Sequence, residues 1–378
     1  LNLPDIPLVD LVVENNELVV ASHGRGFWVL DNIAPLRQAS PQLLASGAHL
    51  FEPPVAIRSG PGVAVSWWLE KAPKRARLEI VDSTGAVLRT FVPDTSKPDS
   101  AESDSAKGGE SAGRAAAPDS VNSDSARADT SKARASRAPA RRGRNAVTHL
   151  PVGAGLSHLT WDLRTDGIVT FPGMILWGAR TSGPAVPPGR YTVRLVADGR
   201  TLTAPVVVKR NPLLTDVSNA DLRAQYAFSK KVRDKANEAN EAVIAIRHVK
   251  KQLENRRKKT SDATLKASMT ALEGKASAIE EKIYQVRNRS GQDPLNFPIK
   301  VNNRLATLLS MAERGDGRPT NNMPEIFQIL SAELESYTDD LARLWKSELI
   351  AVNRQLASDG QLPVDPKCAK AEGCQVVE

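Results

Sequence analysis

Two consecutive apolar stripes with heptad spacing constrain the second half of this 378-residue chain more than any other feature. Each stripe repeats apolar residues at alternating intervals of four and three, which keeps one face of an α-helix apolar. The polar run Lys258-Lys259-Thr260-Ser261 separates the two stripes. The pattern therefore predicts an antiparallel helical hairpin of coiled-coil character over residues 219–289. The stripes are formed by Val232, Ala236, Ala239, Val243, Ile246 and Leu253, and by Leu265, Met269, Leu272, Ala276, Ile279, Ile283 and Val286.

The helical region is expected to extend over residues 211–378. Ser218, followed three residues later by Asp221, is a variant of the capping box that marks the start of a helix. Later apolar repeats predict a short helix near residues 301–309 and a last helix that begins at Pro324. Together with the hairpin, these helices predict a four-helix bundle.

Charge supports this packing and limits the possible partners. Residues 219–289 carry a net charge of +8 and residues 324–358 a net charge of −3, which favours placing the last helix beside the hairpin. The whole chain has a net charge of +8, which allows contact with acidic partners. Aromatic residues make up only 4% of the chain, so base stacking on nucleic acid is not expected. No apolar run approaches the roughly 18 residues that a membrane span requires.

Residues 51–210 alternate between short β-type runs and turn signals, which is typical of a β-sandwich. The clearest strand follows Pro188-Gly189 and alternates apolar and polar residues, and Asp198-Gly199 is a hairpin signal directly after it. Turn signals about every 8–12 residues favour a sandwich of immunoglobulin or fibronectin type III character. The other runs lie at residues 63–69, 76–81, 87–92, 157–163 and 202–208.

Residues 94–146 interrupt this sandwich with a segment of different composition. Ala, Ser, Asp, Arg, Gly and Pro dominate it, and Val121 is its only branched aliphatic residue. Such a segment cannot bury enough apolar surface to offset the entropy cost of ordering. We expect a disordered loop inserted between two strands. It acts either as a solvated tether or as a docking tail for an acidic partner.

Residues 1–50 predict three short strands followed by a linker. Apolar runs at residues 9–13, 18–20 and 27–30 are separated by turn-like segments. A meander of three strands cannot bury its faces alone, so it must pack against something else. The chain begins at Leu1 without a leader pattern, so we read it as a piece of a longer or processed protein.

This N-terminal region resembles the final blade of Asp-box (BNR) β-propeller proteins. The residues that carry the resemblance include His23-Gly24-Arg25-Gly26-Phe27-Trp28, within segments 1–7, 10–13, 16–32 and 35–37. It continues more weakly through residues 159–164, 183–184 and 188–193. The family comprises sialidase-like and sortilin-like proteins, often labelled glycosyl hydrolases in bacteria. The resemblance implies a multidomain β plus α protein, exported to the periplasm or secreted, with a propeller before this region.

The chain departs from that family in its chemistry. It contains no Asp-box, and it lacks the arginine cluster, Tyr–Glu pair and acid/base Asp of a sialidase mechanism. Tyr191 lies in a strand pattern and is better interpreted as a structural residue. No nucleophile elbow, metal-binding spacing or cofactor motif occurs, so no catalytic residue, metal or cofactor is predicted. Whether the parent protein is an enzyme stays open.

Two small groups are candidate ligand contacts. His23, Arg25 and Asp31 flank or follow the Gly24-Arg25-Gly26 turn, and they form either the rim of a binding site or a tight connection between strands. Trp161, Asp162 and Arg164 offer a ring, a carboxylate and a guanidinium. They form either a carbohydrate contact or a core tryptophan beside an ion pair.

Two further features concern the helical region. The basic cluster at the hairpin tip, Arg256-Arg257-Lys258-Lys259, is either a binding patch for an acidic partner or surface, or a solvated turn. Cys368 and Cys374 lie near the C-terminus. The export implied by the family resemblance favours a disulfide between them, whereas in the cytoplasm they would be free thiols.

Three functional hypotheses follow. The first is a non-catalytic C-terminal region of an exported BNR-type protein, which braces the propeller and contacts protein or glycan. The second is part of a glycoside hydrolase whose catalytic residues lie before this region. The third is an adaptor whose basic helical tip binds an acidic partner.

Overall fold

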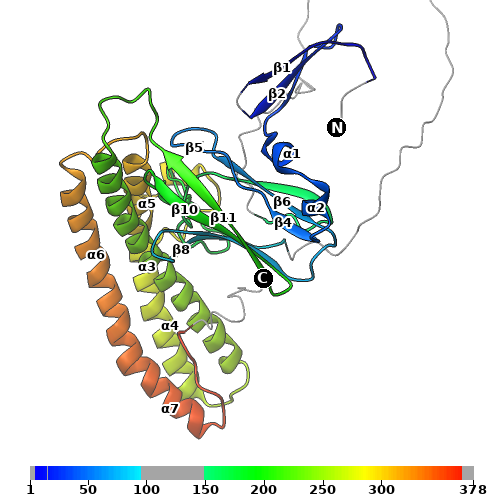
Figure 1. Ribbon diagram of the computed structural model, residues 1–378. Helices are drawn as coiled ribbons and strands as arrows, with labels where there is room; N and C mark the ends of the chain where they lie inside the picture. The colour runs from blue at the N-terminus through cyan, green and yellow to red at the C-terminus, as the bar shows by residue number, and fades with distance from the viewer. Residues whose placement is uncertain (1–4, 15, 95–148, 368–378) are drawn as a thin grey trace, which may run out of the picture.

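The structure is a computed structural model that describes residues 5–14, 16–94 and 149–367. Figure 1 shows a small sheet that projects from a body of two packed sheets, with a long helical bundle along one side of that body. The chain is therefore a mixed β and α protein whose helices follow its strands. Beyond Asp94, the insertion predicted over residues 94–146 lies outside the described residues.

The small sheet is an antiparallel meander, as the sequence predicts. It consists of β1 (Leu8–Glu14), β2 (Glu17–Ser22) and β3 (Phe27–Leu30), in the order β1-β2-β3. Two short helices, α1 (Ala34–Gln38) and α2 (Pro41–Leu44), connect it to the two-sheet body. Each of these helices begins with a proline in its first turn, where the missing N–H costs nothing.

The body contains a three-stranded and a five-stranded sheet around one apolar core. The first has the order β4-β6-β9 and the second the order β5-β11-β10-β7-β8. All neighbouring pairs are antiparallel except β5 and β11. Inward-facing residues of both sheets, including Trp67, Trp161, Leu78 and Leu195, share this core. The strands are β4 (Ala48–Leu50), β5 (Ala56–Ile57), β6 (Val63–Leu69), β7 (Ala76–Val81), β8 (Val87–Phe91), β9 (Gly155–Trp161), β10 (Gly189–Ala197) and β11 (Arg200–Lys209).

The predicted helical hairpin is confirmed. The helices α3 (Asn219–Arg257) and α4 (Ala263–Ile283) bury the apolar residues of both heptad stripes that lie within them. Ser218 and Asp221 form the expected reciprocal capping box. The helix α4 ends before Val286, at Ile283, so the hairpin ends earlier than the predicted residue 289.

The bundle is completed by α5 (Val301–Ala312) and α6 (Met323–Leu344), which continues through a π-helical turn (Trp345–Leu349) into α7 (Ile350–Ser358). A short 3₁₀ turn (Asp293–Leu295) precedes α5. Within the described residues, no helix is both long and apolar enough to cross a membrane.

Ion pairs join the basic hairpin to the acidic last helix, as the charge pattern predicts. Their N–O distances are 3.1 Å for Lys235–Glu335, 2.6 Å for Lys275–Glu348 and 3.6 Å for Lys282–Asp340. Such partly exposed pairs contribute only about 0–1 kcal/mol each, so they orient α6 more than they stabilise it.

A long loop of the two-sheet body belongs in part to the bundle. Residues 166–183, here called the clasp loop, connect β9 to β10, and Ile168 and Phe171 lie in the core of the helices. Side chains of the helices form hydrogen bonds with the backbone of this loop. Asn237 and Asn240 of α3 bond Val169, and Tyr284 at the end of α4 bonds Gly173 and Ile175. In α5, Asn303 bonds Trp177 and Ser310 bonds Arg180.

A buried ion pair lies at the same junction. The Arg58 guanidinium is almost fully buried, and its Nη1 lies 3.0 Å from Asp316 Oδ1, although without hydrogen-bond alignment. Its Nη2 donates to Gln225 Oε1 at 2.9 Å. Burial lowers the pKa of Arg58, and the carboxylates of Asp316 and Glu313 oppose that shift. These contacts hold the sheets and the helices as one unit.

Tyr284→Phe tests the clasp loop. The Tyr284 hydroxyl accepts from Ile175 N and donates to Gly173 O, both at 3.1 Å, while the ring packs edge-on against Phe171. The phenylalanine keeps the ring contact and leaves two backbone groups without partners. We expect a loss of about 1–3 kcal/mol in the free energy of unfolding, measured by urea titration with circular dichroism. Tyr337→Phe is the control, since its hydroxyl bonds only the partly exposed Glu333. If both variants lose the same free energy of unfolding, the bonds of Tyr284 to the clasp loop do not hold the loop on the bundle.

Candidate interaction surface

The projecting β1–β3 sheet has apolar side chains on both faces. Residues paired across antiparallel strands share a face, so the register assigns every position. Leu11 pairs with Val20, and Val20 with Trp28, which defines the first face. The opposite face carries the neighbouring pairs Val12–Val19 and Val19–Val29, together with Ala21–Phe27.

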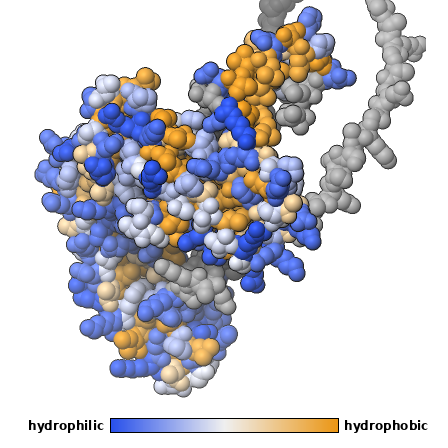
Figure 2. Space-filling model, in the orientation of Figure 1, coloured by the Kyte–Doolittle hydropathy of each residue, from blue (hydrophilic) through white to orange (hydrophobic). Residues whose placement is uncertain are grey.

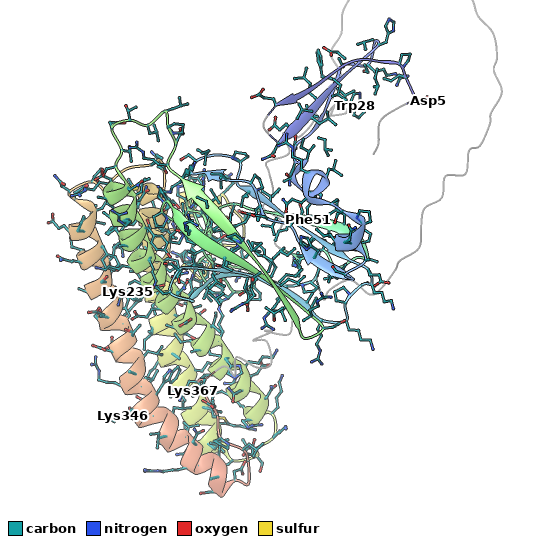
Figure 3. The ribbon with its side chains drawn as sticks, in the orientation of Figure 1. Asp5, Trp28, Phe51, Lys235, Lys346 and Lys367 are labelled. Carbon is teal, nitrogen blue, oxygen red and sulfur yellow. The ribbon has the colours of Figure 1, made fainter. Side chains whose placement is uncertain are left out.

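Half of these side chains are exposed, namely Leu11, Val12, Phe27 and Val29, whereas Val19, Ala21 and Trp28 are half-buried. Phe27 is 77% exposed, Leu11 56% and Val12 52%. Val20 is buried, and so are Ile33 and Ala34 at the start of α1. Figure 2 shows apolar surface on the projecting sheet, and Figure 3 shows Trp28 on this sheet, well away from Phe51 of the two-sheet body.

This arrangement is typical of a sheet that is covered on both sides. A sheet with one solvated face alternates apolar and polar residues, whereas strands buried on both faces read as near-continuous apolar runs. The outer edges of β1 and β3 also have no strand neighbour among the described residues. Exposed apolar patches and open strand edges are both features of interaction sites. The consecutive apolar residues Leu11-Val12-Val13 in β1 and the wholly apolar β3 are the sequence signal that reveals the second apolar face.

The structure does not bring His23, Arg25 and Asp31 to one place. His23 and Arg25 lie in the turn between β2 and β3, and both are exposed. Asp31 follows the far end of β3, next to the position where Leu30 pairs with Leu18. The length of β3 therefore separates the acidic residue from the two basic ones.

Trp161, Asp162 and Arg164 lie together, but as structural residues. The Trp161 ring is fully buried and its Nε1 donates to Arg164 O at 2.9 Å, so it cannot present a face to a sugar. Asp162 pairs with Arg89 at 3.2 Å. Arg164 Nη1 bonds Gly183 O and the Glu313 carboxylate, which ties the sheets to the helices. The interpretation as a core tryptophan beside an ion pair fits this geometry, and the carbohydrate contact does not.

Three residues of the basic tip have partners within the chain. Arg256 donates to Leu362 O at 2.9 Å, Arg257 pairs with Glu273 at 2.9 Å, and Lys258 pairs with Glu254 at 2.6 Å. Lys258 and Lys259 are exposed. The tip is therefore less available to an acidic partner than its sequence indicates.

The remaining candidate residues carry no reactive arrangement. Tyr191 is structural, as expected: its hydroxyl donates to Pro187 O at 2.6 Å, its ring meets Trp161 edge-on, and burial raises its pKa. Among the described residues, no group of three or more His, Cys, Asp or Glu side chains could hold a metal ion. Cys368 and Cys374 lie outside the described residues.

Comparisons with protein family models, with curated proteins and with solved structures find no match to this chain. The resemblance of residues 1–50 to BNR propellers therefore stays a prediction from sequence.

Phe27→Ala and Phe51→Ala form a matched pair that tests the exposure of the small sheet. Phe27 lies on an uncovered face, so its removal should change the free energy of unfolding by less than about 0.5 kcal/mol. Phe51 is buried, so its removal should cost about 3–5 kcal/mol. Urea titrations of both variants give these values. Phe27→Ala should also lower the fluorescence of a bound hydrophobic dye. If Phe27→Ala lowers the free energy of unfolding as much as Phe51→Ala does, the face of the sheet that carries Phe27 is covered.

Proposed function

We propose that the chain is a non-catalytic assembly region of an exported BNR-type propeller protein. In this proposal β1–β3 forms part of a propeller blade, and the two-sheet body and the bundle brace it. The observation that carries the proposal is the sheet with two exposed apolar faces. Export and the choice of a propeller as partner come from the resemblance of residues 1–50.

The geometry of a propeller explains why both faces are apolar. Blades are arranged radially around a central channel, so each blade packs between two neighbours and buries both of its faces. A blade typically contains four strands, whereas β1–β3 supplies three. A further strand at an open edge would complete the blade, and neighbouring blades would cover Leu11 on one face and Phe27 on the other.

The bracing role is supported by the two-sheet body, which we propose to be an immunoglobulin- or fibronectin-like sandwich. One of its sheets has the order β4-β6-β9. It packs against the other sheet, in which β10 lies between β11 and β7. The hydroxyl of Tyr191 in β10 bonds a backbone carbonyl four residues upstream, as in the tyrosine corner of such sandwiches. The clasp loop and Arg58 join this body to the bundle, which gives the blade a rigid support. Any hydrolase activity of the parent protein would then depend on residues outside this chain.

The coding sequence before Leu1 tests the proposal directly. We expect the reading frame to continue upstream through several repeats of blade length, roughly 40–50 residues each, and to begin with a secretory signal. A start codon directly before Leu1 would contradict the proposal.

The phenylalanine pair provides a test at the protein level. In a chain extended by the upstream repeats, Phe27→Ala should become destabilising by about 3–5 kcal/mol, because its ring is then buried. Phe51→Ala should cost the same in the shorter and the extended chain. If Phe27→Ala stays neutral in the extended chain, the sheet is not a blade.

A further inference from the structure

The C-terminal end of the described chain is bound along the helical hairpin. After α7 the chain reverses at Asp359 and Gly360, where Gly360 adopts a φ of 70°. Residues 361–367, here called the strap, then run back along the hairpin as a segment without helix or strand structure (Figure 1). Figure 3 shows Lys367, the last residue of the strap, beside the hairpin helices.

Two side-chain amides hold the backbone of the strap. Asn353 of α7 donates to Val364 O at 2.9 Å and accepts from Val364 N at 2.8 Å. Gln252 of α3 donates to Asp365 O at 2.8 Å and accepts from Asp365 N at 3.1 Å. Each amide thus satisfies both backbone groups of one residue, in the way that a neighbouring β-strand would.

A third backbone contact comes from the basic tip. Arg256 Nε donates to Leu362 O at 2.9 Å. In return, Gln361 Nε2 lies 3.3 Å from Arg256 O, as donor to that carbonyl. The strap is therefore recognised mainly through its main chain.

Only one side chain of the strap is buried. Val364 is 2% exposed and belongs to the apolar core of the bundle, whereas Leu362 is 71% exposed. Pro363 and Pro366 stand near Val364 on either side, and each proline restricts the backbone to a φ near −65°. Such preorganisation lowers the entropy cost of binding an extended segment.

We propose that Gln252, Asn353 and Arg256 form a binding site for extended peptides that carry a β-branched apolar residue between two prolines. The strap occupies this site within its own chain. Because the site contacts mainly the main chain and buries a single side chain, a peptide of the same pattern from a partner protein makes the same contacts. The strap is tethered by a short turn, so its effective concentration is in the millimolar range, and it competes with such a peptide.

Val364→Asp in the full chain tests the proposal, because a carboxylate in the apolar site releases the strap. The probe is a fluorescent peptide, Gln-Leu-Pro-Val-Asp-Pro-Lys, followed by anisotropy. We expect saturable binding at least tenfold tighter to Val364→Asp than to the unmodified chain. Adding Asn353→Ala should weaken this binding about tenfold, because it removes two hydrogen bonds. The matched control is Gln38→Ala, whose amide makes the same pair of bonds to the backbone of Glu52. It should leave binding unchanged.

Val364→Ala is a milder variant that should also expose the site, and circular dichroism checks that both variants stay folded. The proposal is overturned if both variants fold and neither binds the peptide. It is also overturned if both variants unfold the bundle, because Val364 is then only a core residue. Equal binding of a peptide with Asp in place of Val would also overturn it. Dimers of the full chain that vanish with Val364→Asp would overturn it in favour of strap exchange between two copies.

Discussion

Each apolar face of a strand or helix must be buried, and this constraint explains both the body of the molecule and its projecting sheet. The two larger sheets bury their inner faces against each other around Trp67 and Trp161. The hairpin helices bury their heptad stripes against each other and against α5 and α6. The β1–β3 sheet has two apolar faces, and the described chain covers them only in part, because residues of the outer strands such as Leu11, Val12 and Phe27 stay exposed. The sheet is therefore the part of the described chain where this constraint is least satisfied.

The way in which the sheet is attached matters for a bracing role. Arg37 of α1 donates to Asn16 Oδ1 at 3.0 Å, which links α1 to the turn between β1 and β2. At the same end of α1, the amide of the neighbouring Gln38 bonds both backbone groups of Glu52 at 2.9 Å. Together these contacts connect the sheet to the body through hydrogen bonds as well as through the chain itself. In the proposed bracing role, these bonds would connect the sheet to the body, and the clasp loop would connect the body to the bundle.

The sequence predicts the periodic elements and the charge pairing of the hairpin with the last helix, but it does not predict the contacts of the non-periodic loops. The heptad stripes, the capping box at Ser218 and the strand from Gly189 onward follow local rules of spacing, and the structure contains all of them. The clasp loop has no period, so its place on the bundle depends on polar side chains such as Asn240 and Asn303, which are far from it in sequence. Asp31 is close to His23 in sequence, but a strand separates their positions in space.

Amide hydrogen exchange of the chain shows directly whether the β1–β3 sheet lacks the stability of a covered sheet. A three-stranded sheet with uncovered faces has little local stability, whereas β10 and β11 lie in a packed sheet. We expect the amides of residues 8–30 to exchange on the order of 100-fold faster than those of residues 189–209. Equal protection of the two segments would show that the small sheet is stable without a partner. That result would contradict the account.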